Sequence, residues 1–530
     1  MKQKVNEIPL SVHRTPHQDV TYPMYASQFF IGPDFLESKK GWKKVELSQG
    51  LRLSAHPELP VSRIDNDELS LTLIGFMLDP DSPAATDEQI LHNLLTRFSS
   101  IRALTAATAR LGGRWILIAD NKIQRWLFHD ALGLRQVFYT DPAVAGALCA
   151  MSQSGLARDV LGLAFDDEAK DYMDSHVFRS NLEYRWPGTA TAFRGLKHLL
   201  PNHLLNLDTG AVERYWPDKP LASLDPQSAV EDIAHLLQGL VAAGAARFDL
   251  ALSLTAGLDS RLVLAAARHV KDQLTYVTVR QAKMPDNHAD IEVPARLLGS
   301  LGLPHQVIRA ELTMSPEFAY ACKSSVFLSH DHYGADAEAI FRTFGRKKVA
   351  LVGSGGEIGR CSTRVSRLRV WMTSLEETLA RLEIGAAQKF AVHHYRKWLD
   401  EMGDTHNVSI SDLFEWEQEH GNWLAMTELE FDIAWQDTCT PYNSRAVLAT
   451  MLSVNSKYRK GPNSSLFNML IRKLWPAVLA EPINPHRKFS HIQRMKLLRL
   501  AVFIRVHWLE AFILAAMGSA ITVIFTFSRS

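Results

Sequence analysis

The sequence has few cysteines and no excess of charge of either sign. Its four cysteines, Cys149, Cys322, Cys361 and Cys439, stand far apart and form no Cys-x-x-Cys pair. Cysteines this sparse exclude a disulfide scaffold and a structural zinc site, and they are typical of a reducing cytosol. Lys and Arg number 58 and Asp and Glu 57, which leaves a net charge of +1. We therefore expect a cytoplasmic protein without a nucleic-acid partner.

Long apolar runs are also missing, except near the C-terminus. Residues 511–528 form an uncharged, mostly apolar run that is just long enough to be a candidate membrane span. We expect this tail to be a buried terminal helix with a strand-like end at residues 521–527. The alternative is a tail anchor, which would be the protein's one contact with a membrane. Residues 1–9 are polar, so a secretory signal is not expected.

The composition is that of an ordinary globular protein, with 46% hydrophobic and 22% charged residues. The first 215 residues are mainly β-type, and a hairpin is expected at residues 203–216. Prolines then mark a linker at residues 217–228. The remaining strands of the first part are expected at residues 69–77, 115–120, 123–128 and 136–140.

Strands and helices alternate from residue 248 to residue 354, after a helix at residues 229–246. This alternation predicts an α/β domain with a doubly wound parallel sheet, whose ligands bind at the carboxyl ends of the strands. From about residue 365 the chain is helix-rich. We expect strands at residues 249–254, 274–280, 305–309 and 348–352, and helices at residues 259–269 and 288–301.

The loop after the first of these strands is the most informative segment. It reads Leu-Thr-Ala-Gly-Leu-Asp-Ser, from Leu254 to Ser260, and a helix is expected to begin at its end. This loop can bind an anion. Backbone N–H groups and the hydroxyls of Thr255 and Ser260 would donate hydrogen bonds, and the small Gly257 would let the anion approach the backbone closely. Asp259 would repel a phosphate unless it holds Mg²⁺. The alternative is an ordinary turn in which Asp259 or Ser260 caps the helix.

A second glycine-rich loop, from Gly353 to Glu357, follows the strand at residues 348–352. It again ends in a carboxylate at the tip of a parallel strand. Two such loops can hold one Mg²⁺ and a pyrophosphate between them. A Walker-type GxxxxGK[ST] loop is absent from the sequence.

The two loops resemble those of a known family. The first resembles the SGGxDS pyrophosphate loop of ATP pyrophosphatases, and the second resembles the GxGxD-type loop of the asparagine synthetase family, whose relatives include β-lactam synthetases and lasso-peptide cyclases. The resemblance covers the chain to about residue 490. It is also carried by residues 111–115, 130–135, 188–193, 200–203 and 290–299 and by His305.

The resemblance implies two domains. Residues 1–216 would form an Ntn-hydrolase-like αββα sandwich, and residues 229–530 an ATP-pyrophosphatase-type sheet with a helical C-terminal region. The implied activity is an ATP- and Mg²⁺-dependent ligase that adenylates a small-molecule or peptide carboxylate, releases pyrophosphate, and lets an amine displace AMP. A homodimer is compatible with this assignment.

The resemblance also assigns roles to residues. Asp259 and Glu357 would bind the metal, and Glu357 would also take part in catalysis. Lys488 is the expected transition-state cation and Arg487 the alternative, unless both are solvated surface charges. The ATP and pyrophosphate would contact Ser253, Thr255, Ala256, Gly257, Leu258, Asp259, Ser260, Val279, Gly353, Ser354, Gly355 and Gly356.

Three departures separate this chain from a glutamine-dependent asparagine synthetase. The family's glutaminase uses a cysteine directly after Met1, where this sequence has Lys2. Ile74 stands where the family's glutamine-holding Asn is expected. Ser354 replaces the family's Glu and is a poor base, so His332 or Tyr333 would have to serve unless both are ordinary loop residues. We therefore expect no glutaminase activity. A glutamine- or ammonia-dependent asparagine synthetase and a non-catalytic nucleotide-binding scaffold are the alternatives.

Overall fold

The computed structural model describes residues 22–48, 50–181, 183–360, 374–461 and 464–485. The chain divides into two compact units, residues 1–481 and residues 482–530. In the described ranges, no helix is long and apolar enough to cross a membrane. The apolar run at residues 511–528 lies outside the described residues, so its two interpretations stay predictions.

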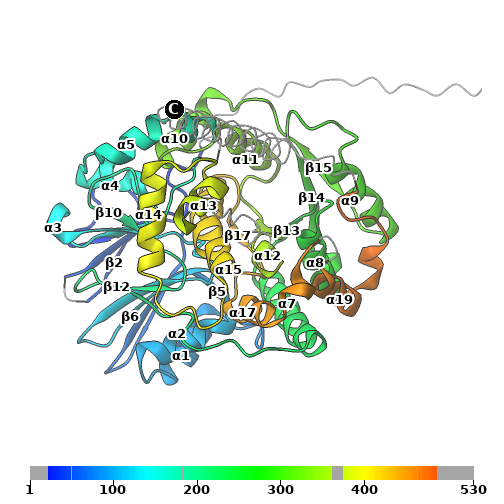
Figure 1. Cartoon of the computed structure of the whole chain (residues 1–530), viewed down its shortest axis with the longest axis horizontal. Helices are drawn as coiled ribbons and strands as arrows, with labels where there is room; N and C mark the ends of the chain where they lie inside the picture. The colour runs from blue at the N-terminus through cyan, green and yellow to red at the C-terminus, as the bar shows by residue number, and fades with distance from the viewer. Residues whose placement is uncertain (1–21, 49, 182, 361–373, 462–463, 486–530) are drawn as a thin grey trace, which may run out of the picture. The chain divides into compact units, whose positions relative to one another are not determined.

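The first part of the chain folds into two antiparallel six-stranded sheets (Figure 1). The first sheet has the order β10-β8-β9-β1-β3-β2 and the second the order β12-β11-β7-β6-β5-β4. The strands are β1 (Phe29–Gly32), β2 (Lys43–Glu46), β3 (Arg52–Ala55), β4 (Val61–Asp65), β5 (Ser70–Leu78), β6 (Gly112–Asp120), β7 (Arg125–His129), β8 (Phe138–Thr140), β9 (Ala150–Met151), β10 (Leu196–His198), β11 (His203–Asn206) and β12 (Val212–Arg214).

Alternating apolar side chains pack the two sheets face to face. Phe29 and Ile31 of β1 share one core with Ile116 and Ile118 of β6. Helices cover the outer faces, α4 (Ser154–Leu161) on the first sheet and α1 (Asp87–Thr96) on the second. The helices of this part are α1 (Asp87–Thr96), α2 (Ile101–Ala107), α3 (Pro142–Ala145), α4 (Ser154–Leu161), α5 (Asp167–Asp174) and α6 (His176–Ser180), with a 3-10 turn at Thr108–Arg110.

The second part contains a five-stranded parallel sheet in the order β15-β14-β13-β16-β17. Its strands are β13 (Leu250–Ser253), β14 (Thr275–Arg280), β15 (Gln306–Arg309), β16 (Val349–Leu351) and β17 (Asp437–Cys439). Its helices are α7 (Pro226–Arg247), α8 (Leu258–Ala266), α9 (Ala289–Ser300), α10 (Pro316–Ser325), α11 (Asp331–Phe344) and α12 (Gly356–Gly359), with a 3-10 segment at Ala267–Gln273.

Helices cover both faces of this parallel sheet. The helices α10, α11 and α16 (Ala425–Phe431) share an apolar core with Ala251 and Val277 on one face. The opposite face carries α7, whose Gly244 lies against Leu250 and Cys439. The C-terminal helices are α13 (Leu375–Glu383), α14 (Lys389–Asp400), α15 (Ile410–Phe414), α16 (Ala425–Phe431), α17 (Arg445–Ser453), α18 (Ser456–Arg459) and α19 (Ser465–Leu474), with a π-helical segment at Glu415–Leu424 and a 3-10 turn at Pro476–Leu479.

These elements confirm the mixed α/β class, the hairpin of β11 and β12, and the four strands expected in the parallel sheet. Two expectations were wrong in detail. Ile123 is 82% exposed in a turn before β7 rather than inside the strand. Helix α7 begins at Pro226, within the expected linker, because Asp225 accepts hydrogen bonds from two amides of its first turn. The domain boundary itself stays a prediction.

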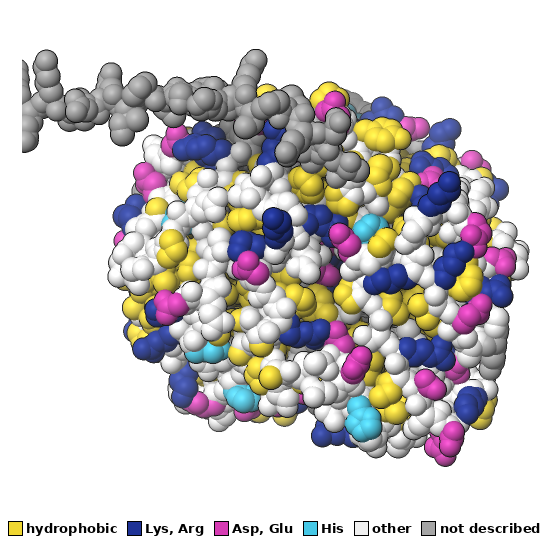
Figure 2. Space-filling view, turned by 180° about the vertical axis from the view of Figure 1, so that it is seen from behind, with side chains coloured by type: hydrophobic (Ala, Val, Ile, Leu, Met, Phe, Trp, Pro, Cys, Tyr) yellow, Lys and Arg dark blue, Asp and Glu magenta, His cyan; other side chains and the backbone are white. Residues whose placement is uncertain are grey.

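Both signs of charge are interspersed on the face shown in Figure 2, where Lys and Arg side chains stand among Asp and Glu. Such a surface has no large field of one sign to attract a polyanion. The expected lack of a nucleic-acid partner stays a prediction.

Candidate functional site

The two glycine-rich loops meet at the centre of the parallel sheet. The chain adds β14 and β15 on one side of β13 and then β16 and β17 on the other, so the strand order reverses between β13 and β16. Ligands bind at such a switch point in open α/β sheets, outside the carboxyl ends of the strands. The loops from Leu254 to Gly257 and from Val352 to Gly355 follow these two central strands.

Two glycines allow the loops to touch. A Cβ atom on Gly353 would lie 2.6 Å from the amide nitrogen of Ser260, and one on Gly356 would lie 2.6 Å from Oδ1 of Asp259. Real Cβ atoms do not approach other heavy atoms this closely, so a side chain at Gly353 would push the loops apart and one at Gly356 would displace the Asp259 carboxylate. The structure therefore explains why the second loop is glycine-rich at these positions.

The first loop is held by its own polar groups. The Thr255 amide donates to Oγ of Ser260 at 3.2 Å, and the Gly257 amide donates to Oγ1 of Thr255 at 3.1 Å. The Ala256 amide donates to Oδ1 of Asp290 at 2.9 Å. The helix cap is Gly257, with no side-chain hydrogen bond, so the alternative in which Asp259 or Ser260 caps α8 was wrong.

Asp259 and Glu357 both lie beside the guanidinium of Arg360. Each is the second residue of its helix, Asp259 in α8 and Glu357 in α12. Arg360 donates from Nε to Oδ1 of Asp259 at 2.7 Å and from Nη2 to Oδ2 at 2.5 Å. Its Nη2 also lies 3.6 Å from Oε1 of Glu357. The structure thus brings together the two carboxylates that the sequence analysis assigned to the metal.

His420 and the second loop bind the other oxygen of Glu357. Oε2 accepts from the Gly355 amide at 3.2 Å and lies 3.5 Å from Nε2 of His420. His420 is buried, which by itself lowers its pKa, but the carboxylates of Glu357 and Glu415 outweigh burial and raise the pKa of His420 to about 9. His420 is therefore an imidazolium near neutral pH.

The two acids respond differently to this setting. Burial, and then the charge of Glu357, raise the pKa of Asp259. For Glu357, burial acts upward but His420 and Arg360 outweigh it, so the pKa of Glu357 is lowered. Glu357 is the firmly ionised member of the pair, and Asp259 depends on a cation to keep its charge.

The donor set fits Mg²⁺ brought by a nucleotide. Among the described residues, no cluster of three or more His, Cys, Asp or Glu side chains could hold a metal by itself. Mg²⁺, however, is commonly bound by one or two carboxylates together with substrate phosphates and water. Asp259 and Glu357 supply that pair beside an anion-type loop.

The other assigned residues lie around the loops, with two exceptions. Ser253 ends β13, Ala256 and Leu258 are buried, and Val279 pairs with Ile308 between β14 and β15. The carbonyl of Ser354 accepts from Oγ1 of Thr440 at 2.8 Å. Lys488 and Arg487 lie outside the described residues.

His332 and Tyr333 lie in the first turn of helix α11, so the alternative in which both are loop residues was wrong; they stand beside the buried contact of His330 with Glu430. The neighbouring His330 lies 2.7 Å from Glu430, and the Tyr333 hydroxyl donates to Oε2 of Glu183 at 3.1 Å. Burial raises the pKa of Tyr333 well above its usual range. Tyr333 therefore acts as a hydrogen-bond donor in this arrangement, and a role as base stays untested.

Three residues around the carboxylates had no role in the sequence analysis. Arg360 caps the C-terminal end of α12, His420 lies in the π-helical segment, and Tyr442 donates from its hydroxyl to the Asp259 carbonyl at 3.3 Å. Arg360 could have been found as a cation three residues after Glu357. No local pattern marks His420 or Tyr442, because both reach the site from distant parts of the chain.

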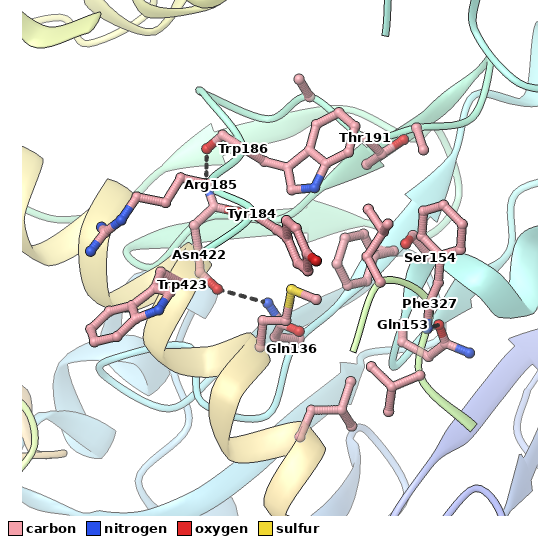
Figure 3. Close-up of a pocket in the computed structure, with 17 residues that line it drawn as sticks. Gln136, Gln153, Ser154, Tyr184, Arg185, Trp186, Thr191, Phe327, Asn422 and Trp423 are labelled. Carbon is pink, nitrogen blue, oxygen red and sulfur yellow. Dashed lines mark hydrogen bonds between the residues drawn. The ribbon is translucent and has the colours of Figure 1, made fainter. Parts of the chain in front are cut away.

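A separate cavity of about 40 Å³ lies between the first sandwich sheet and the π-helical segment (Figure 3). Tyr184, Trp186 and Trp423 form aromatic walls, and Asn422 accepts at its backbone oxygen from Nε2 of Gln136 at 3.3 Å. None of the residues assigned from the sequence lines this cavity. It is therefore distinct from the two loops.

Comparisons with known proteins leave the family open. No family model matches the chain, and no curated protein does. Among 31 matching chains of solved structures is glutamine phosphoribosylpyrophosphate (PRPP) amidotransferase from B. subtilis, complexed with ADP and GMP, at 12% identity and a TM-score of 0.22, covering 73% of this chain and 89% of that one. Another is described as the allosteric regulatory enzyme of purine biosynthesis, at 11% identity and a TM-score of 0.23, covering 73% and 88%. Likenesses this low do not assign this chain to a family.

Proposed function

We propose that this protein is an ATP-dependent amide-bond-forming ligase of the asparagine synthetase type. It adenylates a substrate carboxylate, releases pyrophosphate, and lets an amine displace AMP. One observation carries the proposal: Asp259 and Glu357, on helices that follow adjacent central strands, face a single cation at the switch point of the sheet. That is where a phosphate-bound Mg²⁺ would be held in this type of sheet.

In this proposal, some residues of the site bind the phosphates and others offset their negative charge. The start of α8, which has no side-chain cap, and the hydroxyls of Thr255 and Ser260 would bind phosphate oxygens. The amides of the loop would join them by exchanging their present acceptors on Ser260, Asp290 and Thr255. Mg²⁺ held by Asp259 and Glu357 would offset charge on the departing pyrophosphate. The cation expected from Lys488 or Arg487 would assist at the α-phosphate.

The architecture supports the finer fold assignment within this proposal. Two face-to-face antiparallel sheets with helices outside suit an Ntn-hydrolase-like sandwich. The parallel sheet with a phosphate-type loop after its first strand suits the ATP-pyrophosphatase type. In this proposal the sandwich no longer hydrolyses glutamine, and the amine comes from the substrate or another donor.

A non-catalytic nucleotide-binding scaffold is the second candidate. It is favoured by the internal partners of the site, because Asp290 already binds the Ala256 amide and Arg360 already binds Asp259. A site complemented in this way is stable without a ligand. A scaffold would bind ATP without releasing pyrophosphate.

Pyrophosphate release with hydroxylamine as the amine separates the two candidates. With ATP, Mg²⁺ and a panel of carboxylic acids, the ligase should form a hydroxamate and pyrophosphate. Asp259→Ala should lower this rate by at least about a hundredfold, since a lost metal ligand costs several kcal/mol of charge stabilisation. Asp272→Ala, at an exposed aspartate bound to Lys271, is the matched control and should leave the rate unchanged. Wild-type turnover by Asp259→Ala would disprove the proposal.

A further inference from the structure

The guanidinium of Arg360 occupies the face that both proposed metal ligands present. It donates to both oxygens of Asp259, at 2.7 Å and 2.5 Å, and lies 3.6 Å from Oε1 of Glu357. The remaining oxygen of Glu357 accepts from the Gly355 amide. Each of the four carboxylate oxygens therefore faces a hydrogen-bond donor or a cation of the chain itself.

A divalent cation and Arg360 compete for the same oxygens. A forked arginine–carboxylate contact is among the strongest hydrogen-bonded ion pairs in proteins. Mg²⁺ requires oxygen ligands at about 2.0–2.1 Å in a nearly octahedral arrangement. A metal that reaches Asp259 must therefore displace at least one N–H group of Arg360.

The Asp259 and Glu357 carboxylates share the Arg360 guanidinium in a partly buried site. The Asp259 side chain is 14% exposed and that of Glu357 is 37% exposed, and the loops that carry them are in contact. Both carboxylates lie within 3.6 Å of the Arg360 guanidinium, and partial burial strengthens the repulsion between two like charges so placed. Arg360 contacts both carboxylates and offsets the charge of Asp259, while Glu357 also has His420 beside it.

The position of Arg360 would allow its side chain to move away from Asp259. It lies at the end of the four-residue helix α12, and its side chain is 23% exposed. The arginine of a structural pair in this protein is different, because Arg114 is only 1% exposed and lies in the interior. Part of the Arg360 side chain is therefore exposed to solvent, unlike that of Arg114.

We infer that Arg360 is an exchangeable counter-cation: it holds Asp259 and Glu357 in the free protein and releases Asp259 when a divalent cation arrives with a triphosphate. The phosphates give the released guanidinium a new anionic partner. This inference rests on the proposed nucleotide site. It requires that the divalent cation bind weakly alone and much more tightly together with the nucleotide.

Mn²⁺ titration of the full chain tests this coupling, with free Mn²⁺ followed by electron paramagnetic resonance. Wild-type protein should bind Mn²⁺ weakly alone and tightly with α,β-methylene-ATP. Arg360→Gln should bind Mn²⁺ alone roughly tenfold more tightly than wild type or better, because the competing charge-assisted hydrogen bonds are gone. Adding Asp259→Asn should remove that gain. Arg309→Gln, at an arginine 60% exposed beside Asp286, is the control and should match wild type.

The outcomes separate the inference from the proposed function. Equal Mn²⁺ affinity of wild type and Arg360→Gln without nucleotide would overturn the inference and leave the metal site standing. If no variant lowers free Mn²⁺ further than the nucleotide does without protein, the proposed function is overturned. If Arg360→Gln fails to fold, Arg360→Lys decides the question, because lysine keeps the positive charge but cannot donate two parallel hydrogen bonds to one carboxylate. Tighter Mn²⁺ binding than wild type then supports the inference, and equal binding contradicts it.

Discussion

Arg114 and Asp432 form a forked ion pair in the interior, with contacts of 2.5 Å and 3.0 Å and both side chains only 1% exposed. Arg114 lies on β6 of the sandwich, and Asp432 directly follows α16. Arg114 also reaches Asp437 of β17 at 3.1 Å, and Arg135 binds the other oxygen of Asp437 at 2.6 Å. This buried cluster joins the sandwich to the parallel sheet.

Arg114→Met should destabilise the protein strongly, because Asp432 and Asp437 lose a buried cation. Removal of one partner of a buried ion pair typically costs about 3–5 kcal/mol. Arg309→Met removes an exposed pair with Asp286 and should cost less than about 1 kcal/mol. The midpoints of urea unfolding measure both effects. Equal shifts in the two variants would contradict the role assigned to the cluster.

Glu428, beside the same cluster, should make stability depend on pH. Burial, with added repulsion from Asp432 and Asp437, raises the pKa of Glu428 from 4.5 to about 7, although Arg114 opposes this shift. Between these values the folded protein keeps a proton that the unfolded chain has released, so stability falls as the pH rises through this window. The shift corresponds to about 3 kcal/mol. Glu428→Gln should remove this contribution, so its unfolding midpoint should fall less than that of wild type from about pH 5 to pH 8. Parallel pH profiles would contradict the prediction.

Gly353→Ala should abolish nucleotide binding without unfolding the protein. The added methyl group would lie 2.6 Å from the Ser260 amide nitrogen and would separate the two loops. Gly299→Ala is the control, because a Cβ at this position of α9 meets nothing within 4 Å. Fluorescent ATP-analogue binding and circular dichroism give the two measurements. Wild-type nucleotide affinity in Gly353→Ala would show that the close approach of the loops is not required.

The sequence predicted most of the parallel sheet because its strands are apolar and alternate with amphipathic helices. Strand β17 was missed for a physical reason. It has three residues, Asp437–Cys439, and its buried Asp437 is tolerated only because Arg114 and Arg135 neutralise it. A charged residue in a short segment between helices does not resemble a buried strand. Its burial depends on partners about 300 residues earlier in the chain.

The sequence predicted those residues of the candidate site that belong to short motifs. Asp259 and Glu357 follow glycine-containing loops at the ends of strands, and the order of strands and helices brings such loops together. His420 could not be found in this way, because it lies in a π-helical segment and meets Glu357 only in the folded chain. Arg360 was visible, but its forked contact with Asp259 depends on how closely the two loops pack.

Glutamine incubated with the protein, with or without ATP, should yield no glutamate. Glutamine hydrolysis in the proposed family requires an accessible thiolate. Burial raises the pKa of Cys149 to about 11 and those of Cys322 and Cys439 to about 12, so the three cysteines that the structure describes are protonated near neutral pH. A coupled glutamate assay measures release, and diazo-oxo-norleucine, which alkylates glutaminase thiols, should leave hydroxamate formation intact. Glutamate release that this reagent removes would restore a glutamine-dependent asparagine synthetase as the better assignment.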